Sequence, residues 1–173
     1  MATLLITALC PDRTGLIAAI TGRLFELGAD LGDTTFATLG TGAEFTSVCE
    51  VPAHTAAPEV AEALRALPEL ADGTVTVEPF AFDPVTGPTA HITHRIVVTG
   101  GDRPGLVARL SEVFVTFKAN IVRLDAQRVP TPRGGRYVTR FAVSIPERAV
   151  EACLATVANT AGELGLECQV EQG

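Results

Sequence analysis

A five-residue motif, Asp-Arg-x-Gly-Leu, occurs twice in the sequence, once from Asp12 and once from Asp102. An aspartate at the start of a helix accepts hydrogen bonds from the first N–H groups, so each aspartate is predicted either to cap a helix or to bind a ligand. A glycine in the first turn weakens a helix by about 0.5–1 kcal/mol relative to alanine. We therefore expect Gly15 and Gly105 either to let a ligand reach the backbone or to allow a helix and a strand to pack closely.

A second pair of polar residues, Asp30 and Asn120, stands at matching positions where the chain is predicted to start the next strand. We expect this strand start to lie near the motif loop, where the helix N-terminus attracts an anion such as a carboxylate. Asparagine can donate to a carboxylate and accept from an ammonium group, whereas an ionised aspartate only accepts. The second copy is therefore expected to be the better site, and turn formation is the alternative role of both residues. The candidate ligand-binding residues are Asp12, Gly15, Leu16 and Asp30 in the first copy, and Asp102, Gly105, Leu106 and Asn120 in the second.

The two motifs belong to a longer internal repeat. They lie 90 residues apart, and this offset holds without a gap over residues 12–31 and 102–121. A repeat of this length is too long for a solenoid and indicates two copies of a small domain. The hydrophobic pattern of each copy predicts a strand, an amphipathic helix, a β-hairpin, a second amphipathic helix and a last short strand.

This order, β-α-β-β-α-β, predicts an α+β fold of two ferredoxin-like domains in tandem, each with a four-stranded antiparallel sheet and two helices on one face. Residues 83–90 are rich in proline and glycine and are predicted to be a linker. The first domain is expected at residues 1–82 and the second at residues 91–173. Because sheets have unpaired edges, we expect the two copies to pack edge to edge and the chain to form a homodimer.

The composition is that of a globular protein, with 47% hydrophobic and 19% charged residues. The formal net charge of −7 disfavours direct binding to nucleic acid. No apolar run is long enough to span a membrane and the first residues do not form a basic leader, so a cytoplasmic location without membrane contact is expected. The four cysteines form no C-x-x-C pair and are expected to be free thiols.

No pattern of residues predicts a catalytic site, a metal site or a bound cofactor, so we do not expect an enzyme. Nucleophile elbows, P-loops and dinucleotide-binding glycine motifs are missing from the sequence. His91 and His94 are three residues apart, which places them on opposite faces of a strand. The arginines of one predicted hairpin are interpreted as a solvated tip or, alternatively, as a contact patch for an acidic partner or a phosphorylated ligand. These are Arg128, Arg133, Arg136 and Arg140.

The residues around both motifs resemble the ACT domain. The resemblance rests on Asp-Arg-x-Gly-Leu after a first strand, followed by Ala-Asp-Leu or Ala-Asn-Ile at the start of the next strand. It covers nearly the full chain, and two such domains without another module resemble the glycine cleavage system transcriptional repressor family, especially over residues 4–17 and 32–46. The resemblance implies small amino-acid ligands, glycine or serine foremost, at the interface between paired domains. It also implies repression through contact with a DNA-binding activator protein rather than with DNA.

The first copy departs from the resembled motif at Thr14, where proline is usual, and at Asp30, where asparagine is usual. We therefore expect the first copy to bind a ligand differently from the second, or not at all. The predicted function is an amino-acid-sensing regulatory protein of glycine, one-carbon or amino-acid metabolism that acts through protein contact. The alternatives are a detached regulatory subunit of an amino-acid biosynthetic enzyme and an assembly module without a ligand.

Overall fold

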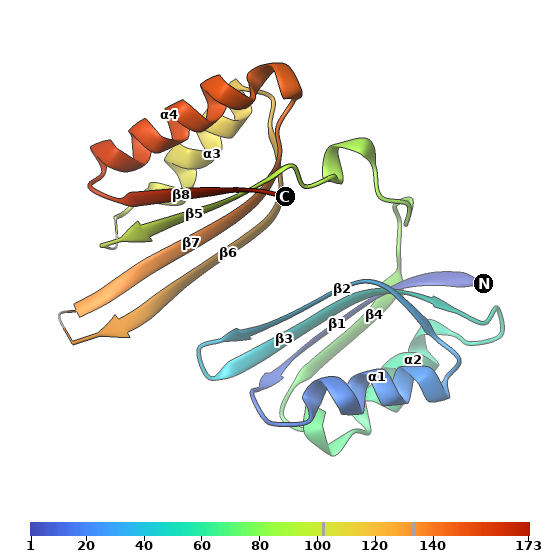
Figure 1. Ribbon diagram of the computed structural model, residues 1–173. Helices are drawn as coiled ribbons and strands as arrows, with labels where there is room; N and C mark the ends of the chain where they lie inside the picture. Colours follow the sequence, from blue (N-terminus) through green and yellow to red (C-terminus); the bar gives the residue numbers. More distant parts are fainter. Residues whose placement is uncertain (102, 133) are drawn as a thin grey trace. The chain divides into compact units, whose positions relative to one another are not determined.

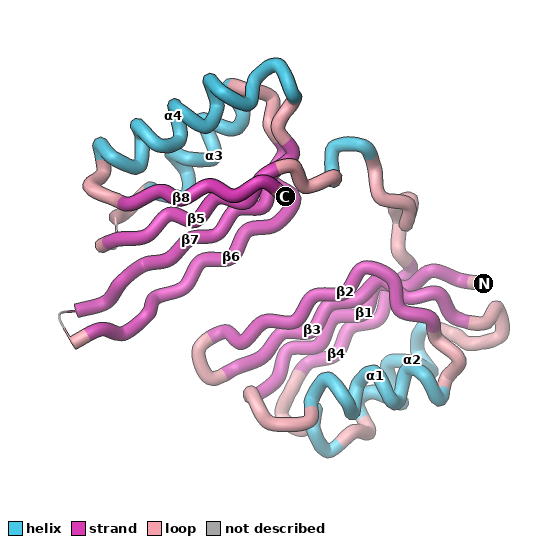
Figure 2. Tube along the Cα trace, viewed as in Figure 1, coloured by secondary structure: helices cyan, strands magenta, loops and turns pink. Residues whose placement is uncertain are grey.

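The computed structural model describes residues 1–101, 103–132 and 134–173. The chain divides into two compact units, Met1–Val85 and Thr86–Gly173. Each unit has the element order β-α-β-β-α-β, which the internal repeat predicts, and in each the two helices cover one face of the sheet (Figures 1 and 2). The division falls inside the stretch predicted as a linker, where residues Pro88–Ala90 form a short 3₁₀ helix, η2.

The first unit contains one antiparallel sheet with the strand order β2-β3-β1-β4. Its strands are β1 (Ala2–Pro11), β2 (Asp30–Leu39), β3 (Gly42–Val51) and β4 (Thr74–Pro79). Its helices are α1 (Leu16–Glu26), α2 (Ala57–Arg65) and the 3₁₀ helix η1 (Pro68–Leu70).

The second unit repeats this arrangement with the strand order β6-β7-β5-β8. Its strands are β5 (His94–Gly100), β6 (Asn120–Thr131), β7 (Gly134–Ser144) and β8 (Glu167–Gln172). Its helices are α3 (Leu106–Thr116), α4 (Val150–Glu163) and the 3₁₀ helix η3 (Glu147–Ala149). The predicted α+β fold of two ferredoxin-like units is therefore confirmed.

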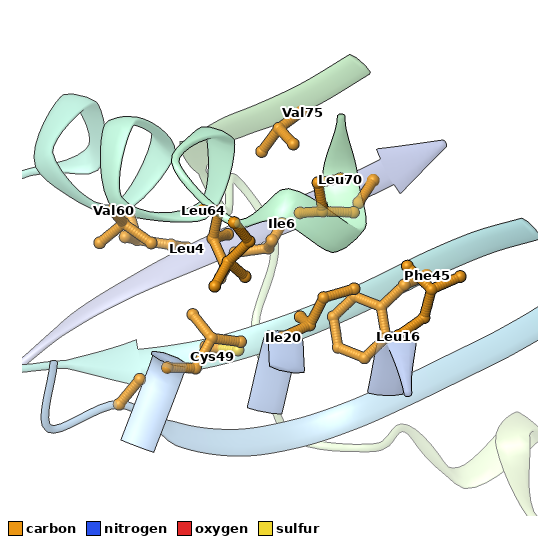
Figure 3. Close-up of a cluster of buried hydrophobic side chains, with 14 of the residues drawn as sticks. Leu4, Ile6, Leu16, Ile20, Phe45, Cys49, Val60, Leu64, Leu70 and Val75 are labelled. Carbon is orange, nitrogen blue, oxygen red and sulfur yellow. The ribbon is translucent and has the colours of Figure 1, made fainter. Parts of the chain in front are cut away.

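Each unit has its own hydrophobic core between the sheet and the two helices. In the first unit, Leu16, Ile20 and Leu24 recur every four residues along α1, so they share the face that is buried. Strand β3 buries every second residue from Ala43 to Val51, which is the alternation expected of a strand with one covered face. Figure 3 shows Leu16, Ile20 and Phe45 within this cluster.

The cores of the two units are packed differently at matching positions of the sheet. Phe45 and Ser47 on β3 correspond to Thr139 and Phe141 on β7, because each pair faces the same two positions of the neighbouring strand. The large ring and the small polar residue have therefore exchanged places. Ser47 Oγ lies 2.7 Å from Thr34 Oγ1, whereas the buried Thr139 hydroxyl has no hydrogen-bond partner among the described residues.

Two further predictions concern the cysteines and the membrane. All four cysteines are free, as predicted, and Cys10, Cys49 and Cys153 are buried. Within the described part of the chain, no helix has the length and apolar character needed to cross a bilayer.

Candidate functional site

The first helix of each unit begins at the leucine of the motif, so the residue before each helix is a glycine. Gly15 precedes α1 with φ at 95°, and Gly105 precedes α3 with φ at 81°. No side chain forms a hydrogen bond that caps either helix. The interpretation of Asp12 as a helix cap is therefore wrong, because the chain needs three more residues of turn before it enters the helix. Asp102 lies outside the described residues.

The two glycines leave their surroundings open. A methyl group built at Gly15 or Gly105 would meet no other atom within 4 Å. Close packing of helix on strand therefore does not explain either glycine, and that alternative is wrong. The left-handed backbone does require them, since residues with a side chain adopt it at a cost. As a consequence the backbone of both turns is uncovered.

A cavity of about 270 Å³ opens over the turn of the first unit. Its walls come from the motif loop, the first turn of α1 and one residue of β2. These residues are Asp12, Arg13, Thr14, Gly15, Leu16, Ile17, Ala18 and Phe36. The motif predicts the loop but does not predict Phe36, whose position beside the loop follows only from the sheet order β2-β3-β1.

The first turn of α1 presents unpaired hydrogen-bond donors to this cavity. The first hydrogen bond of the turn runs from the N–H of Ala19 to the carbonyl of Gly15. The N–H groups of Leu16, Ile17 and Ala18 therefore have no acceptor among the described residues. Three such donors at the positive end of a helix are suited to binding a carboxylate or another small anion.

The leucines of the motif serve the core rather than the cavity. Leu16 and Leu106 each expose only 2% of their surface and belong to the hydrophobic clusters of their units. Their side chains anchor the start of each helix to the sheet. What Leu16 offers to a ligand is its main-chain N–H group.

Arg13 fixes the motif loop of the first unit. Its guanidinium group donates to the carbonyls of Pro68, at 3.2 Å, and Ala71, at 3.4 Å. Both carbonyls belong to the segment between α2 and β4, so the arginine ties the loop to this neighbouring connection. In this arrangement Arg13 holds the cavity wall in place.

Asp30 lies at the other end of the unit from the motif loop. Pro11, the last residue of β1, pairs with Gly42, which in turn pairs with Leu39 at the end of β2. Asp30 is the first residue of β2 and pairs with Glu50, near the start of β1. Because α1 has 11 residues and runs between the two ends, they are separated by about 16 Å. The expectation that Asp30 lies beside the loop of its own unit is therefore wrong.

Asn120 occupies the corresponding place in the second unit and has a structural contact. It pairs with Ser144 of β7. This end of the sheet is the one far from Gly100, the last residue of β5 before the motif loop. Its side-chain Nδ2 donates to the carbonyl of Thr89 in η2 at 2.9 Å. The structure thus brings neither strand-start residue to the loop of its own unit, and Asn120 ties β6 to the segment that precedes β5.

Two arginines in the described part of the second hairpin form ion pairs with acidic residues of other strands in the sheet. Arg140 Nη1 lies 2.7 Å from Asp125 Oδ2, and Arg136 Nη2 lies 2.9 Å from Glu167 Oε2. Both pairs are about half exposed or more, so each contributes little to stability. Arg133 lies outside the described residues.

The histidines are separated by the start of β5. His94 is buried in that strand, and its Nδ1 lies 2.9 Å from Thr93 Oγ1, whereas His91 is exposed. In the described segments, no group of three or more histidine, cysteine or acidic side chains is arranged to hold a metal ion.

No family model and no curated protein matches the sequence. Several solved structures match over more than 90% of the chain, including two with a TM-score above 0.5. A protein from Galdieria sulphuraria described as unknown has a TM-score of 0.74 and 19% identity, covering 99% of this chain and 98% of its own. A candidate glycine cleavage system transcriptional repressor has a TM-score of 0.65 and 15% identity, covering 99% and 97%.

An ACT domain protein from Streptococcus pneumoniae matches with 17% identity and a TM-score of 0.41, over 45% of this chain and 89% of its own. At the identities of the first two matches, 19% and 15%, the likeness is one of fold. Together with the element order of each unit, those two matches confirm the predicted fold of two ferredoxin-like domains in tandem.

Proposed function

We propose that the protein is a cytoplasmic amino-acid sensor that regulates another protein by contact and catalyses no reaction. The observation that carries this proposal is the cavity over the first motif loop, where three N–H groups of α1 have no acceptor among the described residues. The proposed site is thus in the first copy, whereas the residue types favour the second copy, whose Asp102 lies outside the described residues. The helix N-terminus at the first motif loop attracts a carboxylate, which every free amino acid carries. At about 270 Å³ the cavity is smaller than those that hold drug-sized ligands, which suits glycine or serine.

In the proposed complex each part of the amino acid has a partner in the first unit. The ligand carboxylate accepts from the N–H groups of Leu16, Ile17 and Ala18. Asp12 is exposed in the cavity wall and supplies a carboxylate for the ligand ammonium group. Phe36 supplies the apolar wall, so a ligand with a small side chain fits best.

The same site is completed, in this proposal, by a second copy of the chain. Residues Thr34–Leu39 at the edge of the first sheet carry no charge and are exposed, which favours pairing with another strand. Strand β6, the corresponding edge, carries Arg123, Asp125, Arg128 and Pro130, which discourage such pairing. Antiparallel pairing of two β2 strands places Asp30 of the partner subunit at the same end of the sheet as the motif loop.

The regulated partner is proposed from the whole-chain likeness to a candidate glycine cleavage system transcriptional repressor. By that analogy, the chain contacts a DNA-binding activator protein and does not bind DNA itself, in keeping with its net charge of −7. There are two alternatives to this function. In the first, the partner is a biosynthetic enzyme; in the second, the chain is an assembly module that binds no ligand.

Calorimetric titration with the twenty amino acids tests the ligand. A variant Ala18→Leu fills the cavity with an exposed side chain in α1 and keeps the helix propensity, so we expect it to abolish binding at the first loop. Ala108→Leu makes the matched change at the corresponding position of α3 and reports on the second loop. Binding that survives in both single variants and in the double variant would contradict the proposed site.

Capture experiments with and without the amino acid found in the titration test the partner. We expect the chain to retain a transcriptional activator in a manner that depends on the ligand, and the Ala18→Leu variant to lose that dependence. Ligand-dependent capture of a biosynthetic enzyme instead would support the first alternative. Titrations that show no binding of any amino acid would support the assembly module.

A further inference from the structure

A second cavity, of about 310 Å³, lies in the second unit, on the face of the sheet that the helices do not cover. It is formed where β5 ends, where β7 begins and where the chain turns from α4 into β8 (Figure 1). Its lining residues are Thr99, Gly100, Gly101, Gly135, Arg136, Gly165 and Glu167.

The polar side chains of this cavity stand on the face of the sheet that the helices leave uncovered. Thr99 follows the buried Val98 in β5, so its side chain points away from the core, and it pairs directly with Glu167 of β8. Arg136 Nη2 donates to Thr99 Oγ1 at 2.8 Å and to Glu167 Oε2 at 2.9 Å. These two bonds occupy one nitrogen of the guanidinium group and hold the arginine at the cavity, while its remaining N–H groups stay available.

Four of the seven lining residues are glycines, and the fold accounts for only two of them. A side chain at Gly100 would collide with the side chain of Leu166, and Gly165 has φ at 71° at the end of α4. Gly101 and Gly135 have no positive φ, and a methyl group built at either would meet no atom within 4 Å. Neither backbone conformation nor packing requires these two glycines, yet each leaves part of the cavity floor without a side chain.

A second arginine borders the cavity. A methyl group built at Gly165 would lie 4.0 Å from Arg103 Nη2, which places this guanidinium group at the rim. Unlike Arg13, its counterpart in the first unit, Arg103 makes no hydrogen bond or ion pair with the rest of the described chain. Among the described residues of the cavity and its rim, two arginines therefore stand beside one glutamate.

The first unit serves as an internal comparison, because its matching positions carry none of these groups. Leu9 and Pro11 stand where the second unit has Thr99 and Gly101, as the offset of 90 residues gives. Strand register places Gly42 at the position of Arg136 and Thr74 at the position of Glu167. The arginine, the glutamate and the bare floor therefore occur together in the second unit only.

We propose that this cavity is a binding site for a small oxyanion, a carboxylate or a phosphate group, which Arg103 and Arg136 hold above the bare backbone of Gly101 and Gly135. Arginine binds both kinds of oxyanion through two parallel N–H groups. Glu167 and Thr99 orient Arg136 toward the anion. The site is separate from the proposed amino-acid cavity in the first unit, and its occupation does not depend on an amino acid.

Titration of the full chain with inorganic phosphate and with acetate, at constant ionic strength and followed by amide chemical shifts, tests the proposal. We expect saturable shifts at Gly101 and Gly135, and a loss of affinity of about tenfold in Arg103→Gln. Arg123→Gln is the matched control, because it removes the same charge from an exposed position of β6 in the same unit but outside the cavity, and it should leave the phosphate affinity unchanged. Tighter binding of phosphate than of acetate assigns the site to phosphate groups, and the reverse order assigns it to carboxylates.

A steric variant separates the cavity from simple charge attraction. Gly135→Val adds a side chain in open space on a strand, so it should fold normally and yet weaken anion binding at least as much as Arg103→Gln. Gly87→Val makes the same change at a glycine that also has open surroundings but lies outside the cavity, and it should leave binding unaltered. Shifts that do not saturate, or an Arg103→Gln variant with full affinity, would overturn the proposal even if amino-acid binding in the first unit is observed.

Discussion

At the residue scale, the backbone of the two motif loops is set by glycine. Gly15 and Gly105 hold left-handed conformations with no neighbouring atom within reach of a side chain. The cost of a substitution there is therefore conformational strain alone, without a steric collision. This separates the two glycines from Gly73, where an added methyl group would lie 2.7 Å from Cys10 Cβ.

Replacement of Gly15 by alanine should lower the free energy of unfolding by about 1–2 kcal/mol, the cost of a left-handed conformation for a residue with a side chain. Urea denaturation followed by circular dichroism measures this change. Gly162→Ala is the control, because Gly162 lies in α4 with open surroundings, and alanine there should stabilise the chain by about 0.5–1 kcal/mol. An unchanged stability of Gly15→Ala would show that the turn relaxes to another conformation.

The buried thiols make stability depend on alkaline pH. Burial raises the pKa of the Cys49 and Cys153 thiols above their ordinary value of 9.0, so the folded chain keeps them protonated where the unfolded chain loses the proton. Their contribution to stability is therefore fully present below pH 9.0 and falls as the pH rises through the folded-state pKa values, by at most about 1.4 kcal/mol per pH unit for each thiol. Urea denaturation across this range measures the slope, and Cys153→Ala should reduce it. An identical slope in that variant would contradict the assignment.

At the element scale, the two units use one framework with different packing. The hairpin of the second unit is longer, with β6 of 12 residues and β7 of 11 against 10 residues in each of β2 and β3. On the second strand of that hairpin, β3 or β7, phenylalanine and a small hydroxyl residue have exchanged places. The first unit satisfies its buried hydroxyl at Ser47, and the second leaves Thr139 without a hydrogen-bond partner among the described residues.

Replacing each of these hydroxyl residues should therefore change stability in opposite directions. Thr139→Val keeps the shape of the side chain and removes a buried polar group without a partner, so we expect a gain of about 1 kcal/mol in the free energy of unfolding. Ser47→Ala removes the partner of Thr34 and should cost about 1 kcal/mol. Chemical denaturation of both variants beside the parent chain tests the pair. A destabilised Thr139→Val would show that its hydroxyl group has an acceptor.

The sequence predicts the elements well and the loops less well, for physical reasons. Apolar residues at helical or alternating spacing predict the strands and helices, because burial of one face enforces that spacing. The motif suggests a cap at Asp12, but the positive φ of Gly15 moves the helix start to Leu16. The distance from the loop to Asp30 depends on the direction of α1 between two antiparallel strands, and Phe36 joins the cavity only through strand order. Local residue types do not carry such information.

At the scale of the whole molecule, the two copies of the fold are not equivalent in what they offer to other molecules. In the first unit, residues Thr34–Leu39 of the outer strand carry no charge, and a cavity lies beside helix N–H groups that have no acceptor among the described residues. The second unit has charged residues and a proline on its outer strand, and a cavity lined by an arginine and a glutamate. These differences are the basis of the two proposals, strand pairing by the first unit and anion binding by the second.

Assembly provides the last prediction. We expect light scattering at micromolar concentration to give about twice the chain mass of 18.1 kDa, through antiparallel pairing of two β2 strands. Ala37 lies on β2 near the centre of the proposed contact, so a lysine there faces its own copy across the two-fold axis, and like charges opposite each other destabilise a strand pair. Ala37→Lys should therefore shift the protein toward monomer, and added salt should partly restore the dimer because it screens the repulsion. Gln127→Lys makes the matched change 90 residues later on β6 and should leave the dimer intact. A dimer lost in Gln127→Lys and kept in Ala37→Lys would assign the contact to the second unit, and a monomeric parent chain would exclude the pairing altogether.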